Sequence, residues 1–154
     1  MTLPTRKQNR KQWFDYSSAW WYFITICTGE RIPYFGSIHN GIMQNTTIWK
    51  IAHEYRLEIP LIYWSSVDID TFVIMPNHIH AIIILHKNAS SVSTIIKSYK
   101  QQVTKKANEE GLWFSRQKSF HDHIIRDQVS YERIQLYIEN NPEKWAEDTF
   151  YTEI

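Results

Sequence analysis

The segment from Phe72 to Leu85 constrains the fold more than any other part of the chain. Two stretches rich in apolar and β-branched residues are separated only by Pro76 and Asn77, residue types that are common in turns. A connection this short makes consecutive strands run antiparallel, side by side. The sequence therefore predicts a β-hairpin, with one strand within Leu61 to Met75 and the other from His78 to Leu85.

Strand and helix patterns follow one another through the rest of the chain. In chain order, the sequence predicts a strand from Trp20 to Thr28, a helix from Gly41 to Glu58 ended by Pro60, the hairpin, a helix from Ser91 or Ser93 to about Glu110, a strand from Lys118 to Arg126, and a helix from Ser130 to about Asn140.

This order, β-α-β-β-α-β followed by one more helix, is that of the α+β ferredoxin-like split βαβ fold. In that fold an antiparallel sheet carries its helices on one face, and here a C-terminal helix is added. The sequence contains no repeat and no linker, so we expect residues 1–154 to form one domain with a basic N-terminal arm over residues 1–15. The fold alone assigns no activity.

Composition excludes several classes of protein. A hydrophobic fraction of 43% argues against disorder, and the apolar run from Ala81 to Leu85 is too short to cross a bilayer. Cys27 is the only cysteine, which rules out an internal disulfide and a multi-cysteine zinc site. No apolar segment of signal-peptide length follows the N-terminus. We therefore expect a cytoplasmic protein that makes no membrane contact.

The glycines argue against a nucleotide cofactor. Gly36 and Gly41 have the spacing of the first two glycines of a phosphate-binding P-loop. Ile42 and Met43, however, stand where that loop requires Lys and Ser or Thr. The sequence therefore predicts chemistry that is not driven by a nucleotide.

Basic residues gather in two sectors although the net charge of the chain is only +1. Such sectors attract polyanions, but a solvated basic surface is an equally good interpretation of any single residue. The candidates for phosphate contacts are Arg6, Lys7, Arg10 and Lys11 near the N-terminus, Lys97, Lys100 and Lys105 in the helix after the hairpin, and Arg116, Lys118 and Arg126 around the strand that follows.

His78 and His80 lie two residues apart in a predicted strand. Because side chains alternate along a strand, both imidazoles should face the same way and could chelate a cation. The apolar residues around them would give such a site a rigid, dry support. A pair of partly buried structural histidines is the alternative.

Tyr137 and Asn141 lie four residues apart in the last predicted helix, one turn from each other on the same face. A phenol and an amide would then project together. Alternatively, Tyr137 is a core aromatic and Asn141 caps the helix before Pro142.

Together these residues resemble a known family. The segment Phe72 to Ile84 resembles the HUH motif, two histidines flanking a hydrophobic residue, of the single-tyrosine transposases, particularly the REP-associated tyrosine transposases and related insertion-sequence transposases. The segment Tyr137 to Pro142, preceded by Phe120 to Asp127, resembles the part of those proteins that carries the nucleophilic tyrosine and an Asn-Pro. Trp21 to Thr28, with Arg31 and Phe35 after it, resembles their first strand.

The resemblance implies a metal-dependent endonuclease and strand transferase that acts on single-stranded or hairpin DNA. His78, His80 and Asn141 would hold Mg²⁺ or Mn²⁺, and Tyr137 would attack the phosphate to give a 5′-phosphotyrosine and a free 3′-hydroxyl. It also implies a bacterial, nucleoid-associated protein. The family contains both homodimers and monomers, and the sequence favours neither.

Two further points belong to this interpretation. His121 and His123 form a second pair that could be an alternative metal site, although the resemblance favours supporting or DNA-contacting residues over primary metal ligands. Two other functions stay open: a binding module derived from a transposase that no longer cuts, and a ferredoxin-like RNA phosphoesterase, whose activity would survive loss of Tyr137.

Overall fold

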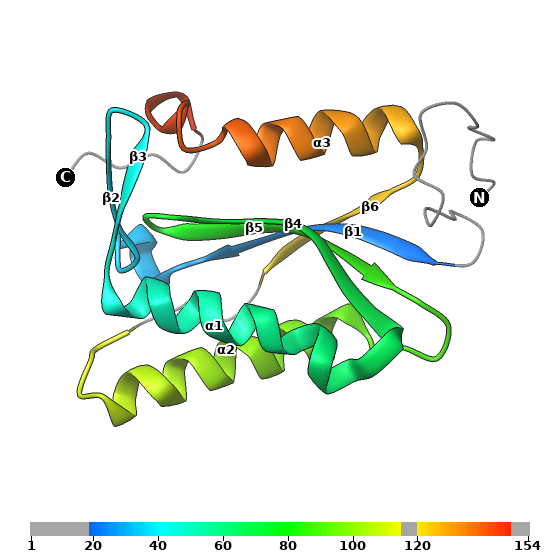
Figure 1. Ribbon diagram of the computed structural model, residues 1–154, viewed down its shortest axis with the longest axis horizontal. Coiled ribbons are helices and arrows are strands. Elements are labelled where there is room, and N and C mark those ends of the chain that lie inside the picture. Colours follow the sequence, from blue (N-terminus) through cyan, green and yellow to red (C-terminus); the bar gives the residue numbers. More distant parts are fainter. Residues whose placement is uncertain (1–18, 115–119, 149–154) are drawn as a thin grey trace.

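A four-stranded antiparallel sheet forms the centre of the computed structural model, which describes residues 19–114 and 120–148 (Figure 1). Its strands are β1 (Trp20–Cys27), β4 (Val67–Met75), β5 (His78–Leu85) and β6 (His121–Ile125), in the spatial order β4-β5-β1-β6. The helices α1 (Thr47–Tyr63) and α2 (Val92–Glu109) cover one face, and α3 (Gln128–Asn140) covers the other (Figure 1). The predicted α+β ferredoxin-like fold with an added C-terminal helix is confirmed.

Strand β5 lies between β4 and β1, and all eight of its residues are buried. Successive side chains of β5 point to opposite faces of the sheet, so they contribute to two separate apolar clusters. Ile79, Ala81 and Ile83 belong to the apolar cluster under α1 and α2, whereas Ile82 and Ile84 pack with α3. His78 and His80 have the same parity as Ile82 and Ile84, so both imidazoles face α3.

Helix α3 is fixed to this second face at several points. Asp127 caps its N-terminus by accepting a hydrogen bond from Ser130 N at 2.8 Å. Tyr131 packs edge-on against Trp21, with 5.5 Å between ring centroids, and its hydroxyl donates to Asp70 Oδ2 at 2.7 Å. Ile134 completes this apolar stripe. The C-terminal half of α3 is thereby held above the start of β5.

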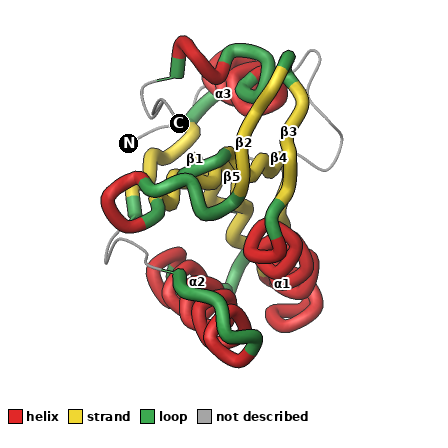
Figure 2. Tube along the Cα trace, turned by 90° about the vertical axis from the view of Figure 1, so that its left-hand side faces the viewer, coloured by secondary structure: helices red, strands yellow, loops and turns green. Residues whose placement is uncertain are grey.

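The segment before α1 differs from the sequence prediction. Residues 36–45 form a second hairpin, β2 (Gly36–His39) with β3 (Ile42–Asn45), where the periodicity predicted the start of a helix. Asn40 and Gly41 both adopt a positive φ, 54° and 75°, as a two-residue hairpin turn requires. Figure 2 shows the β2–β3 hairpin extending from α1 toward α3 across the end of the sheet.

Helix α1 begins and ends later than predicted. It begins at Thr47, where Thr46 accepts a hydrogen bond from Trp49 N at 3.2 Å, and it continues through Pro60 to Tyr63. A proline in the last turn removes only one hydrogen bond of the helix, and Ile59 beside it is buried. Strand β4 begins at Val67, after the short helix η2 (Trp64–Ser66), and lies within the predicted range from Leu61 to Met75, whose first residues belong to α1 and η2.

The other element limits are close to the predictions. Helix α2 begins after its cap Ser91, whose side chain accepts from Thr94 N, and ends one residue before Glu110. Helix α3 begins two residues earlier than predicted, because Asp127 is the capping residue. No helix in the described ranges is both long enough and apolar enough to cross a membrane.

Candidate active site

Two imidazoles lie side by side at the start of β5, facing α3. The ring centroids of His78 and His80 are 4.5 Å apart, and the two residues are 0% and 1% exposed. Burial lowers the pKa of each histidine to about 3. Both rings are therefore neutral at physiological pH, and each can offer a nitrogen lone pair to a cation.

His78 is oriented by its neighbour in the hairpin turn. Its Nδ1 lies 2.8 Å from Asn77 Oδ1, and because an amide oxygen only accepts hydrogen bonds, Nδ1 carries the proton. The lone pair is then on Nε2, which lies 3.7 Å from Asp148 Oδ2. With a neutral ring, this contact is a polar approach and not an ion pair.

His80 is oriented from the adjacent strand. Thr25 stands opposite it in the β1–β5 pairing, and the Thr25 hydroxyl lies 2.9 Å from His80 Nδ1. The other ring nitrogen, Nε2, lies 3.5 Å from the hydroxyl of Tyr137. Each imidazole therefore has one nitrogen engaged by the scaffold and the other directed to the space below α3.

Tyr137 lies at the rim of this space. Its ring packs edge-on against Phe23, 6.2 Å away, and lies 5.3 Å from the His80 ring, while 41% of the residue stays exposed. Burial, and next the charge of Asp148, raise the pKa of the phenol. The hydroxyl is therefore protonated at neutral pH, but it can be reached from outside.

Asn141 ends α3 and turns its side chain into the same space. It is 2% exposed, its backbone N–H donates to Ile138 O at 3.3 Å, and its Nδ2 donates to Asp148 Oδ2 at 2.7 Å. Its Oδ1 is buried without a hydrogen-bond partner among the described residues. A buried amide oxygen in this state is unfavourable, and a cation or a water bound there would satisfy it.

Asp148 was not predicted from the sequence. Its side chain is fully buried, because the short helix η3 (Trp145–Glu147) turns the chain back toward the histidines, with Trp145 buried and its ring 6.0 Å from the His78 ring. One ligand atom each from His78, His80 and Asp148 lie within 4.8 Å of one another. The acidic character of the segment after Asn141 is a signal in the sequence, but spacing does not show which acid returns to the histidines.

This set of donors fits a divalent cation. Two neutral imidazoles, a carboxylate and the unsatisfied amide oxygen of Asn141 converge on one side of β5. Imidazole nitrogens suit Mn²⁺ better than Mg²⁺, which prefers oxygen ligands. The residues present therefore agree with a metal centre that would contain His78, His80 and Asp148, with Asn141 beside it.

The predicted basic contacts are mostly distant from this centre. Lys97 and Lys105 are exposed, but they lie on α2, which covers the opposite face of the sheet. Arg126 is half-buried between β6 and α3. The remaining candidates, Arg6, Lys7, Arg10, Lys11, Arg116 and Lys118, lie outside the described residues.

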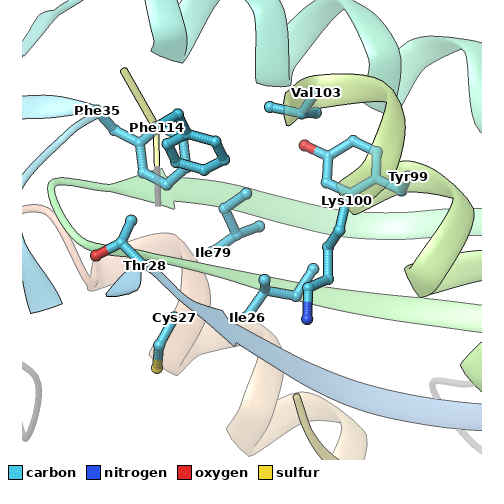
Figure 3. A pocket seen from close by; sticks show the side chains of 9 residues that line it. All are labelled: Ile26, Cys27, Thr28, Phe35, Ile79, Tyr99, Lys100, Val103 and Phe114. Carbon is cyan, nitrogen blue, oxygen red and sulfur yellow. The ribbon is translucent and has the colours of Figure 1, made fainter. Parts of the chain in front are cut away.

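Lys100, predicted as a candidate phosphate contact, is instead buried in the structure. It is only 4% exposed, and its aliphatic chain lines a small apolar cavity with Ile26, Phe35 and Phe114 (Figure 3). Lys97, three residues earlier on α2, is exposed. The two lysines therefore lie on opposite sides of the boundary between the apolar and the solvent-exposed face of the helix. Lys100 therefore does not belong to an outer phosphate-binding surface.

His121 and His123 lie on the edge strand β6, opposite Thr25 and Phe23 of β1. Directly paired residues share a face, so both histidines are on the α3 side of the sheet, and both are exposed. Phe23 separates His123 from Tyr137, since it contacts the Tyr137 ring. The pair is thus outside the buried cluster but on the same face of the sheet.

The chain is similar to known proteins over most of its length. No family model matches it. An uncharacterized protein of Haemophilus influenzae is 32% identical over 170 residues, which cover 96% of this chain and 94% of that protein.

Two solved structures have a similar fold. The first is a REP-associated tyrosine transposase bound to a REP hairpin, with a TM-score of 0.62, 21% identity, and coverage of 90% of this chain and 74% of that one. The second is a candidate transposase from Deinococcus radiodurans, with a TM-score of 0.50, 13% identity, and coverage of 88% and 97%. At these identities the likeness shows the fold, which is the one that the sequence resemblance implied.

Proposed function

Because this chain belongs to the same family as the Haemophilus influenzae protein and has the fold of a tyrosine transposase, we propose that it is a metal-dependent DNA endonuclease and strand transferase. One observation carries the proposal. The Tyr137 hydroxyl lies 3.5 Å from His80 Nε2, next to a buried His-His-Asp group that can hold a cation. A nucleophile and a metal centre within reach of one phosphate are the minimum that this chemistry requires.

In the proposed reaction, Tyr137 Oη attacks the phosphorus of a DNA phosphodiester. The new bond is a 5′-phosphotyrosine, the bond to the 3′-oxygen breaks, and the phenol proton is released as the free 3′-hydroxyl takes up a proton. The covalent intermediate keeps the energy of the phosphodiester, so rejoining needs no nucleotide. When bound, a divalent cation would supply Lewis-acid stabilisation of the charge that develops on the phosphate oxygens.

The residues of the chain prepare this reaction in three ways. Burial keeps His78 and His80 neutral, and Asn77 and Thr25 fix the ring that each presents to the cation. Burial raises the pKa of Tyr137 and keeps the phenol protonated at neutral pH, so its proton must be released during the attack. Asn141 Nδ2 donates a hydrogen bond of 2.7 Å to Asp148 Oδ2 and so holds this carboxylate beside the two histidines.

We further propose single-stranded or hairpin DNA as the substrate. Tyr137 opens onto a groove beside the C-terminal half of α3, which is also lined by Arg133, Leu136, Asn140, Asn141, Lys144, Glu147 and Asp148. Arg133, on the helix that carries the nucleophile, and Lys144, just after that helix, can contact the phosphates of a single strand, whose backbone is accessible on all sides. The transposase structure with the similar fold is itself bound to a hairpin.

The test is covalent trapping. Wild type and Tyr137→Phe are incubated with labelled single-stranded and hairpin DNA plus Mn²⁺, and the products are separated on a denaturing protein gel. A labelled adduct with wild type that is absent from Tyr137→Phe supports the proposal. DNA binding without an adduct in either protein would indicate a binding module, and equal metal-dependent cutting by both would indicate a phosphoesterase that uses activated water. Either result contradicts the proposal.

A further inference from the structure

Asn77, in the turn between β4 and β5, joins two segments that meet at the metal centre. It is 0% exposed, and its side chain uses both ends: Oδ1 accepts from His78 Nδ1 at 2.8 Å, and Nδ2 donates to Arg31 O at 3.2 Å. Its backbone oxygen accepts from Thr28 N at 3.0 Å. The amide therefore connects an imidazole of the proposed centre with the turn that follows β1.

That turn holds an unusual backbone. In the short helix η1 (Gly29–Arg31), Glu30 and Arg31 have φ values of 53° and 57°, the left-handed region that residues other than glycine rarely adopt. Two successive strained residues persist only where surrounding contacts fix them, and such strain is concentrated at functional sites. The Asn77 amide supplies one of those contacts, through the Arg31 carbonyl.

The turn also brings a cation close to the histidines. Arg31 is exposed, and it follows Cys27, which pairs with His78 across β1 and β5. Figure 3 shows the Cys27 side chain pointing away from the Phe35 and Phe114 rings, so it lies on the side of the sheet that α3 covers. The Arg31 carbonyl accepts from the side chain of Asn77, the residue next to His78, at 3.2 Å. The turn therefore places Arg31 beside the end of β5 that carries His78.

We propose that Asn77 is a positioning residue for two groups at once. It orients the His78 imidazole so that Nε2 faces the cation, and it holds the left-handed turn so that the Arg31 guanidinium binds a phosphate of the DNA strand. This inference rests on the proposed function. It adds a phosphate subsite formed by Arg31, in the turn that follows β1. An Arg fork matches two phosphate oxygens, which a lysine cannot do.

The first test measures the metal without any reaction. Mn²⁺ is titrated into apo protein and the free ion is measured by electron paramagnetic resonance. Asn77→Ala should bind Mn²⁺ about 10- to 100-fold more weakly than wild type, which is the usual effect of losing a partner behind a metal-ligating histidine. Arg31→Gln keeps both Asn77 hydrogen bonds and should bind Mn²⁺ as wild type does. Wild-type affinity in Asn77→Ala would overturn the assignment of His78 orientation.

The second test measures the phosphate subsite. Single-stranded DNA binding is followed against salt in a Tyr137→Phe background, where no cleavage occurs. Arg31→Gln should lower the slope of log K against log salt by about one contact. Lys97→Gln, which removes one charge on the far face, should leave it unchanged. An Arg31→Gln slope equal to that of the background protein would overturn the subsite.

The two parts are linked by a double-mutant comparison. If Asn77 holds the turn, then Arg31→Gln weakens DNA binding less in an Asn77→Ala protein than in one with Asn77 intact. Equal effects in the two backgrounds would overturn the link. Should Asn77→Ala fail to fold, as judged by circular dichroism, Asn77→Ser takes its place. These measurements need no cleavage, so failure to form an adduct would defeat the proposed function without deciding the role of Asn77.

Discussion

Asn141 and Asp148 are joined across the end of α3 by a hydrogen bond of 2.7 Å from the Asn141 amide to the Asp148 carboxylate. The bond brings the same carboxylate oxygen to 3.7 Å from His78 Nε2. The residue predicted as the third metal ligand therefore holds an acid that the sequence did not single out.

We expect Asp148→Asn to bind Mn²⁺ at least about 10-fold more weakly than wild type. The substitution removes the one anionic donor of the group while keeping its shape, so a cation loses most of its charge compensation. Calorimetric titration of Mn²⁺ measures the change. Glu147→Gln, which removes the same charge from the exposed neighbour, is the matched control and should bind normally. Equal affinities of the Asp148→Asn and wild-type proteins would leave Asn141 as the third ligand.

The buried histidines predict a stability that falls in mild acid. Burial lowers the pKa of His78 and His80 to about 3, below the value of about 6.5 in the unfolded chain, so the unfolded state binds more protons between these two values. Their contribution is fully present above pH 6.5 and is lost as the pH falls toward 3. From pH 7 to pH 5 we expect each histidine to lower the free energy of unfolding by about 2 kcal/mol.

Urea unfolding at pH 7 and pH 5 measures this loss. A His80→Gln variant, whose amide can still bond to the Thr25 hydroxyl, should lose about half as much stability over the same interval. A variant with the full wild-type pH dependence would show that His80 is not a source of the effect.

Much of this site follows from short-range patterns in the sequence. Alternation along a strand placed His78 and His80 on one face, and a separation of one helical turn placed Tyr137 and Asn141 together. These geometric predictions depend only on the local backbone. Their predicted roles in chemistry stay proposals, because geometry alone does not test them.

Features that depend on tertiary contacts escaped prediction. Asp148 reaches His78 only because Trp145 is buried and turns the chain back. Lys100 is interior because its aliphatic chain lines an apolar cavity between α2 and the sheet. The β2–β3 hairpin is a different case. Its Asn40-Gly41 turn is a short-range signal, but the apolar spacing of the residues that follow also fits a helix, and that spacing was given more weight.

The anchor of α3 gives a second kind of prediction. Tyr131→Phe removes the hydroxyl that donates to Asp70 Oδ2 at 2.7 Å, while the ring can still pack on Trp21. We expect a loss of about 1 kcal/mol in stability, and a slower rate of adduct formation because α3 carries the nucleophile over His80. Single-turnover trapping at saturating DNA measures that rate. Ser130→Ala, a change near the start of the same helix that leaves its backbone cap in place, is the control. A destabilised variant with an unchanged rate would confine Tyr131 to a structural role.

The positions of the basic residues predict which charges DNA encounters. Arg133 and Lys144 line the groove beside Tyr137, whereas Lys97 is exposed on the opposite face of the sheet. In a Tyr137→Phe background, replacing Arg133 and Lys144 together with Gln should lower the slope of log K against log salt by about two contacts, each releasing about 0.7 counterions from a single strand. Lys97→Gln paired with Lys105→Gln removes the same charge and should leave the slope unchanged. If replacing Lys97 and Lys105 lowered the slope and replacing Arg133 and Lys144 did not, the strand would lie on the face of the sheet covered by α1 and α2, and Tyr137 could not be its nucleophile.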